Sequence, residues 1–131
     1  MRDEIGLVTL LINNAGIAGD IGEGWKIPPE NVQKVLGVNF LAHCWTLREF
    51  IPDMIMQEKG QIVTICSILG FSAGPAGAAY IASKHALKGY MESVKEDLRK
   101  RPDAGNIKVT IAFPHNTLTN LSAKANLRAG Y

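Results

Sequence analysis

Three short apolar runs constrain the fold of this chain more than any other feature of its sequence. Leu7–Ile12 and Gln61–Cys66 are continuous runs rich in β-branched side chains, and a third run, Ile107–Phe113, ends at Pro114. Continuous hydrophobicity, as opposed to strict alternation, is typical of strands that are buried on both faces of a parallel sheet. The three runs therefore predict three parallel strands.

Helical periodicity fills the stretches between these runs. Apolar residues recur at helical spacing over residues 28–59, where we expect Pro52 to end or kink the helix early and Gly60 to terminate it. A second helix is predicted over Ala78–Arg101. The order strand, helix, strand, helix, strand predicts an α/β fold: a partial, Rossmann-like, doubly wound parallel sheet with two long helices, forming one domain over residues 1–131.

Composition excludes several classes of protein. With 47% hydrophobic and 20% charged residues, the chain has the balance of a globular protein. Its net charge is +2 and its densest basic patch, Arg99–Arg101, lies at a predicted helix end, so we expect no nucleic-acid partner. Cys44 and Cys66 have no CxxC spacing and are predicted to be reduced and buried, and the three histidines lack ligand spacing, so no metal site is expected. The absence of a signal peptide or membrane span indicates a cytoplasmic protein.

Polar residues follow each of the three predicted strands. Asn13–Gly16 follows the first strand, Ser67 the second and Pro114–Thr119 the third. Ligands of doubly wound sheets bind at the carboxyl ends of the strands. These clusters therefore predict one binding site at this edge of the sheet.

Tyr80 and Lys84 bring acid–base chemistry to the same edge. Their four-residue spacing near the start of the second helix places both side chains on one helical face. A neighbouring ammonium favours the phenolate and should lower the pKa of the tyrosine, which could then exchange a proton with an alcohol or ketone oxygen. Ser67 could share that oxygen by a hydrogen bond.

The combination of these motifs resembles the short-chain dehydrogenase/reductase superfamily. The matching elements are Asn13-Asn14-Ala15-Gly16, a helix asparagine (Asn39), Ser67 followed by Tyr80-x-x-x-Lys84, and Pro114-x-x-x-x-Thr119. They occur in the family's order, and the resemblance covers almost the whole chain, from the fourth strand of the family fold to just past the sixth. It implies an oxidoreductase that uses NAD or NADP.

The resemblance also implies a role for each matching residue. Tyr80 would be the acid/base, Ser67 would orient the substrate, and Lys84 would bind the nicotinamide ribose. Asn39 would hold a water that connects Lys84 to solvent. The remaining matches would line the cofactor: Asn13, Ala15 and Gly16 on its adenosine-ribose side, and Pro114 and Thr119 at the nicotinamide end.

Two segments of the first helix are similar to a narrower branch. Asn39–Thr46 and Phe50–Ile55 resemble epidermal and related retinol dehydrogenases and the lipid-droplet 17-beta-hydroxysteroid dehydrogenases. This implies a lipophilic, retinol- or steroid-like alcohol as substrate and a homodimer formed through the two long helices. It also implies a location at the endoplasmic reticulum or lipid-droplet surface, reached through an N-terminal apolar segment that is missing before Leu7.

One departure from the family concerns the cofactor fingerprint. No Gly-x-x-x-Gly-x-Gly turn precedes Leu7, and the glycines of Gly70–Gly77 have a different spacing and fall in the substrate-side loop. We therefore expect the chain alone to be inactive, and to be unstable or self-associating through a bare apolar strand edge.

The alternative function is a truncated, non-catalytic chain that pairs through its helices. Trp25 and Trp45 are interpreted as packing residues of the core or of loops.

Overall fold

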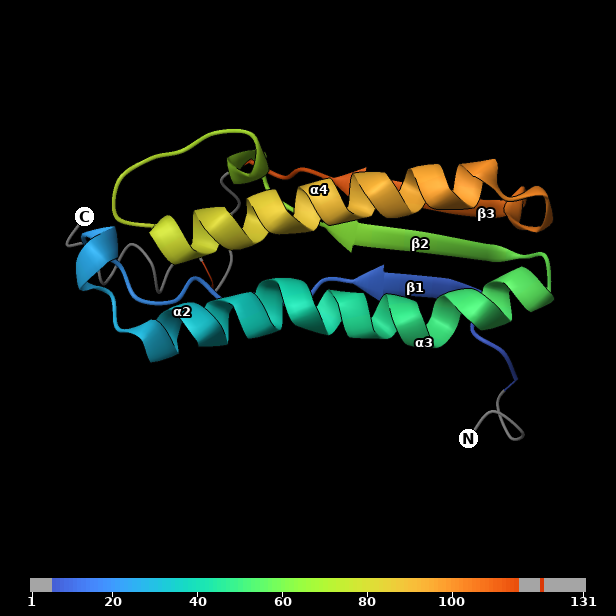
Figure 1. Ribbon diagram of the computed structural model, residues 1–131, viewed down its shortest axis with the longest axis horizontal. Coiled ribbons are helices and arrows are strands. Elements are labelled where there is room, and N and C mark those ends of the chain that lie inside the picture. Colours follow the sequence, from blue (N-terminus) through green and yellow to red (C-terminus); the bar gives the residue numbers. More distant parts are fainter. Residues whose placement is uncertain (1–5, 116–120, 122–131) are drawn as a thin grey trace.

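The computed structural model describes residues 6–115 and Leu121 (Figure 1). The strands are β1 (Leu10–Asn13), β2 (Gly60–Ile65) and β3 (Ile107–Ala112). The helices are α2 (Pro29–Leu36), a π-helical segment η2 (Gly37–Leu41), α3 (Ala42–Met56) and α4 (Ala78–Lys100). Short 3₁₀ turns are η1 (Gly24–Lys26), η3 (Ile68–Gly70) and η4 (Pro102–Ala104). Thr119 lies outside the described residues.

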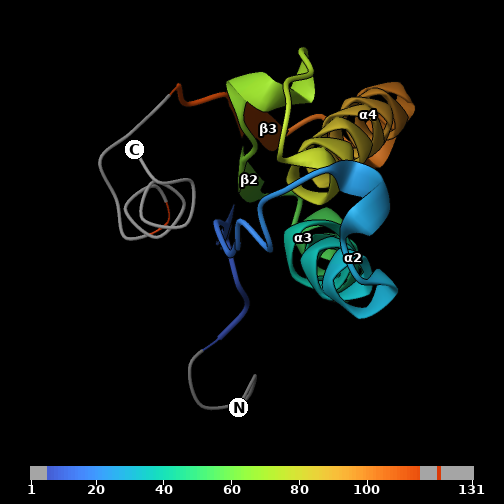
Figure 2. The same cartoon turned by 90° about the vertical axis from the view of Figure 1, so that its left-hand side faces the viewer.

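The strands form a parallel sheet in the order β1-β2-β3. Ile62 in the central strand pairs with Leu11 on one side and Val109 on the other. Helices α2, α3 and α4 lie together on one face of this sheet, with α4 running alongside α3 (Figures 1 and 2). The predicted α/β, Rossmann-like parallel sheet with two long helical stretches is confirmed.

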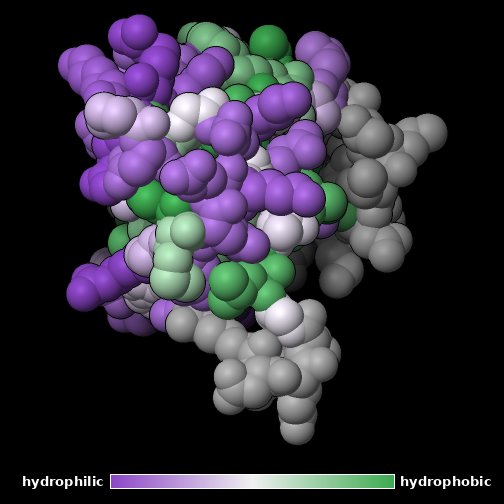
Figure 3. Space-filling model, turned by 90° about the vertical axis from the view of Figure 1, so that its right-hand side faces the viewer, coloured by the Kyte–Doolittle hydropathy of each residue, from purple (hydrophilic) through white to green (hydrophobic). Residues whose placement is uncertain are grey.

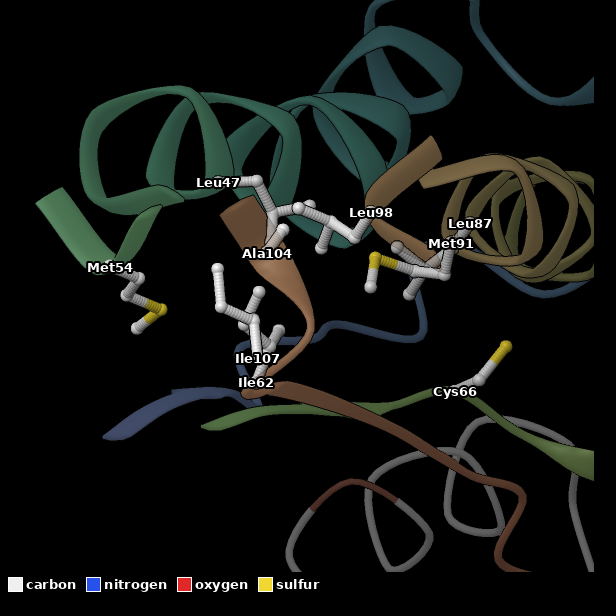
Figure 4. Close-up of a cluster of buried hydrophobic side chains, with 9 residues drawn as sticks. All are labelled: Leu47, Met54, Ile62, Cys66, Leu87, Met91, Leu98, Ala104 and Ile107. Atoms are coloured by element: carbon white, nitrogen blue, oxygen red, sulfur yellow. The ribbon is translucent and has the colours of Figure 1, made fainter. Parts of the chain in front are cut away.

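The hydrophobic core lies between the helices and that face of the sheet (Figure 4). Helix α3 contributes Leu47 and Met54, and α4 contributes Leu87, Met91 and Leu98. Ile62 meets them from β2 and is fully buried. The i, i+4, i+11 spacing within α4 places its core residues along one stripe, which fixes the rotation of α4 about its axis.

The other face of the sheet is only partly buried, so the prediction that the first strand is buried on both faces is wrong. Leu10 is 50% exposed and Ile12 57% exposed, whereas Asn13 on the alternate position is buried. Side chains alternate between the two faces of a strand, and the described helices cover only one face. The strand also begins at Leu10, three residues later than predicted, and ends at Asn13.

The first helix differs from its prediction at Pro52 and at Gly60. Pro52 does not end it: α3 continues to Met56. Pro52 and Arg48, whose carbonyl loses its helical partner, are both exposed, so water can satisfy that carbonyl. Gly60 is not the terminator but the first residue of β2, and Glu58 takes the positive φ of 48° at the helix end.

Several surface residues also differ from expectation. Trp25 is 80% exposed and Trp45 63% exposed, so the core alternative of the prediction is wrong for both tryptophans. Both cysteines are free, but only Cys66 is buried, whereas Cys44 is half-buried.

Hydrophilic side chains cover most of the end of the molecule at which α4 finishes (Figure 3). There Arg99 pairs with Glu96 and Arg101 with Asp103, so two of the three consecutive basic residues face carboxylates. None of the helices in the described part of the chain is long and apolar enough to cross a membrane. Within the same residues, no three metal-ligating side chains come together.

Candidate functional site

Tyr80, Ser67 and Lys84 meet at the carboxyl ends of the strands, where α4 begins. Ser67 directly follows β2, and its Oγ caps η3 by accepting a hydrogen bond from the backbone N–H of Leu69 (3.1 Å). The Ser67 hydroxyl also lies close enough to the Tyr80 hydroxyl to act on its pKa. Lys84 lies one turn along α4 from Tyr80, with its Nζ 5.6 Å from the centre of the Tyr80 ring. The structure thus brings together the three side chains that the sequence pattern singled out.

Lys84 is a buried cation with little compensation from the protein. Its residue exposure is 4%, and its Nζ donates a hydrogen bond to the carbonyl of Ile65 at 3.3 Å. Among residues 6–115 it forms no ion pair. Burial holds the pKa of Lys84 below its ordinary value. An ammonium placed this way favours a polar ligand that can accept its remaining hydrogens.

The pKa of Tyr80 differs from the sequence-based prediction. Burial raises it above its ordinary value, and this outweighs the lowering effect of the neighbouring Ser67 hydroxyl. The expectation that Lys84 lowers the pKa of Tyr80 is therefore wrong for this structure. The reason is physical: the removal of water disfavours the phenolate as well as the ammonium.

Asn39 lies in the π-helical segment η2 and is fully buried. Its Oδ1 accepts a hydrogen bond from the backbone N–H of Ile17 (2.8 Å), and its Nδ2 donates to the carbonyl of Ile17 (2.9 Å) and to Ser83 Oγ (3.0 Å). Ser83 in turn donates to the carbonyl of Tyr80 (2.6 Å). The Asn39 side chain therefore connects the loop after β1 with the first turn of α4.

The loop after β1 passes beside Lys84. A Cβ atom built on Gly16 would lie 3.8 Å from Lys84 Nζ and 3.7 Å from Asn39 Oδ1. Ala15 and Gly16 are exposed, whereas Asn13 at the end of β1 is buried, with its Oδ1 2.8 Å from Thr46 Oγ1. Of the predicted cofactor-lining residues, Ala15 and Gly16 are thus the accessible ones next to the buried cation.

His43 and Thr46 belong to the same neighbourhood, although the sequence analysis did not single them out. His43 is 2% exposed, and its Nε2 lies 2.9 Å from the carbonyl of Ala15. Thr46 contacts Asn13 as described. The signal in the sequence was their spacing: together with Asn39 they stand at i, i+4 and i+7, which is one face of a helix.

The substrate-side segment after Ser67 is anchored to α4 and β3. Pro114 accepts a hydrogen bond at its carbonyl from the backbone N–H of Ile68 (3.1 Å). The Phe71 ring lies 4.7 Å from Lys88 Nζ and 4.6 Å from the centre of the Phe113 ring. Thr119, the last predicted cofactor contact, lies outside the described residues.

Comparison with known proteins agrees with this geometry. The family model described as short chain dehydrogenase matches residues 1–129. Epidermal retinol dehydrogenase 2 of Homo sapiens is 41% identical over 117 residues, which are 87% of this chain and 36% of that protein. Retinol dehydrogenase 10 of Rattus norvegicus is 33% identical over 128 residues, 98% of this chain and 37% of that protein.

A solved structure supports the same assignment. The short-chain dehydrogenase/reductase of Burkholderia phymatum in complex with NAD superposes with a TM-score of 0.86 at 30% identity, covering 97% of this chain and 44% of that one. The chain spans little more than a third of the length of the curated relatives above. The chain belongs to the short-chain dehydrogenase family.

Proposed function

We propose that the protein carrying this chain is an NAD- or NADP-dependent oxidoreductase that interconverts a lipophilic alcohol and its carbonyl compound. The observation that carries the proposal is the convergence of Ser67, Tyr80 and a buried Lys84 at the carboxyl edge of the sheet. The family assignment supports the same reaction class.

The residues of the described site fit a nicotinamide cofactor. Lys84 has hydrogens to donate beyond its one carbonyl partner, which suits the hydroxyls of a ribose. Gly16 leaves space beside the ammonium that a side chain would occupy. Asn13, Ala15 and Pro114 border the same edge. When bound, the cofactor supplies the redox chemistry.

The protein side chains would handle the proton and the substrate oxygen. Tyr80 would donate a proton to a carbonyl oxygen, or take one from an alcohol, through its hydroxyl. Ser67, which neighbours Tyr80, would share that oxygen and hold it in place. Lys84 would hold the ribose hydroxyls next to Tyr80 through the hydrogens of its ammonium. Asn39 would position Tyr80 through Ser83. As the family resemblance implies, it would also hold a relay water.

Two observations support a lipophilic substrate. The segment directly after Ser67 exposes apolar side chains, since Ile68 is 39% exposed and Phe71 56% exposed. The relatives with the similarities given above are named retinol dehydrogenases. A retinol- or steroid-like secondary or allylic alcohol, handled at the endoplasmic reticulum or lipid-droplet surface, is therefore the substrate class we propose.

The test is a turnover assay on the full-length protein. Each of NAD and NADP is offered with retinol, a hydroxysteroid and the hydrophilic alcohol xylitol, and the absorbance of the reduced cofactor is followed. We expect turnover with the lipophilic alcohols, and a loss of roughly 10² in kcat/KM for Ser67→Ala. The matched control is Ser93→Ala on the exposed surface of α4, which should change nothing. No turnover with any alcohol, or faster turnover of xylitol, would refute the proposal.

A second candidate function is pairing through the outer surface of the helices. Leu41 is 41% exposed and Trp45 63% exposed, and their four-residue spacing puts both on one helical face. Large exposed apolar side chains that lie together favour a protein interface. The full-length protein would be a homodimer through this face, and a chain of these 131 residues alone would pair with a full-length subunit without turnover.

Sedimentation velocity tests the pairing. Trp45→Arg should shift the full-length protein toward the monomer mass, whereas Trp25→Arg, at a more exposed tryptophan in the turn η1, should leave the mass unchanged. A dimer that survives Trp45→Arg would exclude this face.

A further inference from the structure

The helical stretch η2–α3 contacts the end of β1 and the loop after it through three successive side chains. In order along the helix, the contacting pairs are Asn39 with Ile17, His43 with Ala15, and Thr46 with Asn13. Successive turns of the helix therefore contact alternate residues of this segment, which runs antiparallel to the helix. Of the three helix residues, Asn39 has a role in the proposed chemistry, whereas His43 and Thr46 have none; His43 differs from Thr46 in leaving a buried ring nitrogen without a hydrogen-bond partner in the described residues.

The contact of His43 fixes its tautomer. A carbonyl oxygen can only accept, so the Nε2 atom 2.9 Å from Ala15 carries the hydrogen, and Nδ1 is left with a lone pair. That Nδ1 is buried and has no hydrogen-bond partner within the described structure. Burial also holds the pKa of His43 below its ordinary value, with a further lowering effect of the Lys84 charge, so the ring is neutral.

An orphaned acceptor makes histidine a poor choice for packing alone. An apolar side chain of similar size would fill the same space without leaving a buried lone pair unsatisfied. The feature that such a side chain would lack is the donor to Ala15. Ala15 itself is exposed, so water can hydrate its carbonyl if the loop moves away. The hydrogen bond from His43 to Ala15 therefore affects the position of the loop more than the stability of the fold.

We propose that His43 is a positioning residue for the cofactor. Its Nε2–H holds the carbonyl of Ala15 and thereby keeps Gly16 next to the Lys84 ammonium, where a Gly16 Cβ would be in van der Waals contact with Nζ. This inference rests on the proposed function, because it takes the Ala15–Gly16 backbone as part of the cofactor site. Without the donor, the loop samples other positions and the binding-competent fraction falls, which weakens the apparent affinity by that fraction.

The test compares His43→Leu with His43→Gln in the full-length protein. Leu removes the donor and also the orphaned acceptor, whereas Gln retains an N–H donor of similar reach. Dissociation constants for NADH and NADPH are measured by fluorescence, cofactor KM and kcat by turnover, and melting temperature by calorimetry. Amide hydrogen exchange over residues 14–17 reports the loop without any cofactor present.

For His43→Leu we expect a cofactor dissociation constant raised by roughly two- to tenfold, the range of one net hydrogen bond, with kcat at saturating cofactor nearly unchanged. Exchange over residues 14–17 should be faster and the melting temperature no lower. His43→Gln should restore affinity and exchange. If His43→Leu does not fold, His43→Gln decides alone: near-normal affinity and exchange support the proposal.

Other results overturn it. Unchanged affinity and exchange in His43→Leu would show that the loop does not depend on His43. Lower stability with an unchanged cofactor KM would make His43 a packing residue, and so would weak binding in His43→Gln. If the unmodified protein binds neither cofactor, the proposed function fails, and the exchange data still show whether His43 holds the loop.

Discussion

Replacing Lys84 by methionine separates the function of the buried ammonium from its effect on stability. Lys84 is 4% exposed and has one carbonyl partner at 3.3 Å. Removal of an ammonium from water costs several kcal/mol after relaxation, and a hydrogen bond from a charged donor offsets about 1.5–3 kcal/mol of this. Methionine has a similar linear shape and carries no charge. We therefore expect Lys84→Met to raise the free energy of unfolding by about 1–3 kcal/mol.

Equilibrium urea denaturation of the full-length protein measures this change. The midpoint should move to higher urea with an unchanged slope, because the surface exposed on unfolding stays the same. Turnover and cofactor binding should be lost in the same variant, since the residue that we propose binds the ribose is gone.

Lys88→Met is the matched control for this experiment. Lys88 lies one turn further along α4, its side chain is 22% exposed, and it pairs with Glu92 at 2.9 Å. Its loss should lower the unfolding free energy by at most about 1 kcal/mol and should not abolish turnover. If Lys84→Met instead destabilises the protein as much as Lys88→Met does, the ammonium is a structural element and the reasoning from burial is wrong.

Two further predictions concern packing and pH. Gly60→Ala should destabilise the protein by about 1–3 kcal/mol, because the new Cβ would lie 2.6 Å from Met54 Sδ and 2.9 Å from Met54 Cβ. Gly89→Ala should stabilise the protein by about 0.5–1 kcal/mol, because its new Cβ would have no atom within 4 Å and alanine favours a helix interior. Urea midpoints that move in the same direction would contradict this pair. Because burial lowers the pKa of His43 in the folded state, the unfolded state binds more protons below about pH 6.5, so the unfolding free energy should fall as the pH drops through that value. His43→Gln should flatten that part of the profile, and an unchanged profile would contradict the assignment.

The strand and helix order was predictable because each element has a strong periodic or continuous apolar pattern. Ile107–Phe113 was predicted as a strand and β3 spans Ile107–Ala112; Ala78–Arg101 was predicted as a helix and α4 spans Ala78–Lys100. The ends of the first helix were less predictable. Whether Pro52 breaks a helix depends on whether solvent reaches the freed carbonyl, and a sequence does not contain that information.

The site was predictable in its membership but not in its electrostatics. The carboxyl ends of neighbouring parallel strands meet at one edge, so Ser67 and the Asn13–Gly16 segment had to lie near each other. The sign of the Tyr80 pKa change could not be obtained in the same way, because it depends on the balance of burial and charge in three dimensions. The contacts of His43 and Thr46 were missed because their spacing also fits an ordinary packing face.

Tyr80→Phe in the full-length protein tests the central claim most directly. Tyr90→Phe, the same substitution on the same helix at a residue that is 38% exposed, is the control. With a lipophilic alcohol as substrate, the account predicts that Tyr80→Phe lowers kcat by about 10² or more and leaves the cofactor dissociation constant nearly unchanged, while Tyr90→Phe keeps full activity. Full activity in Tyr80→Phe would remove this hydroxyl from the mechanism and contradict the account.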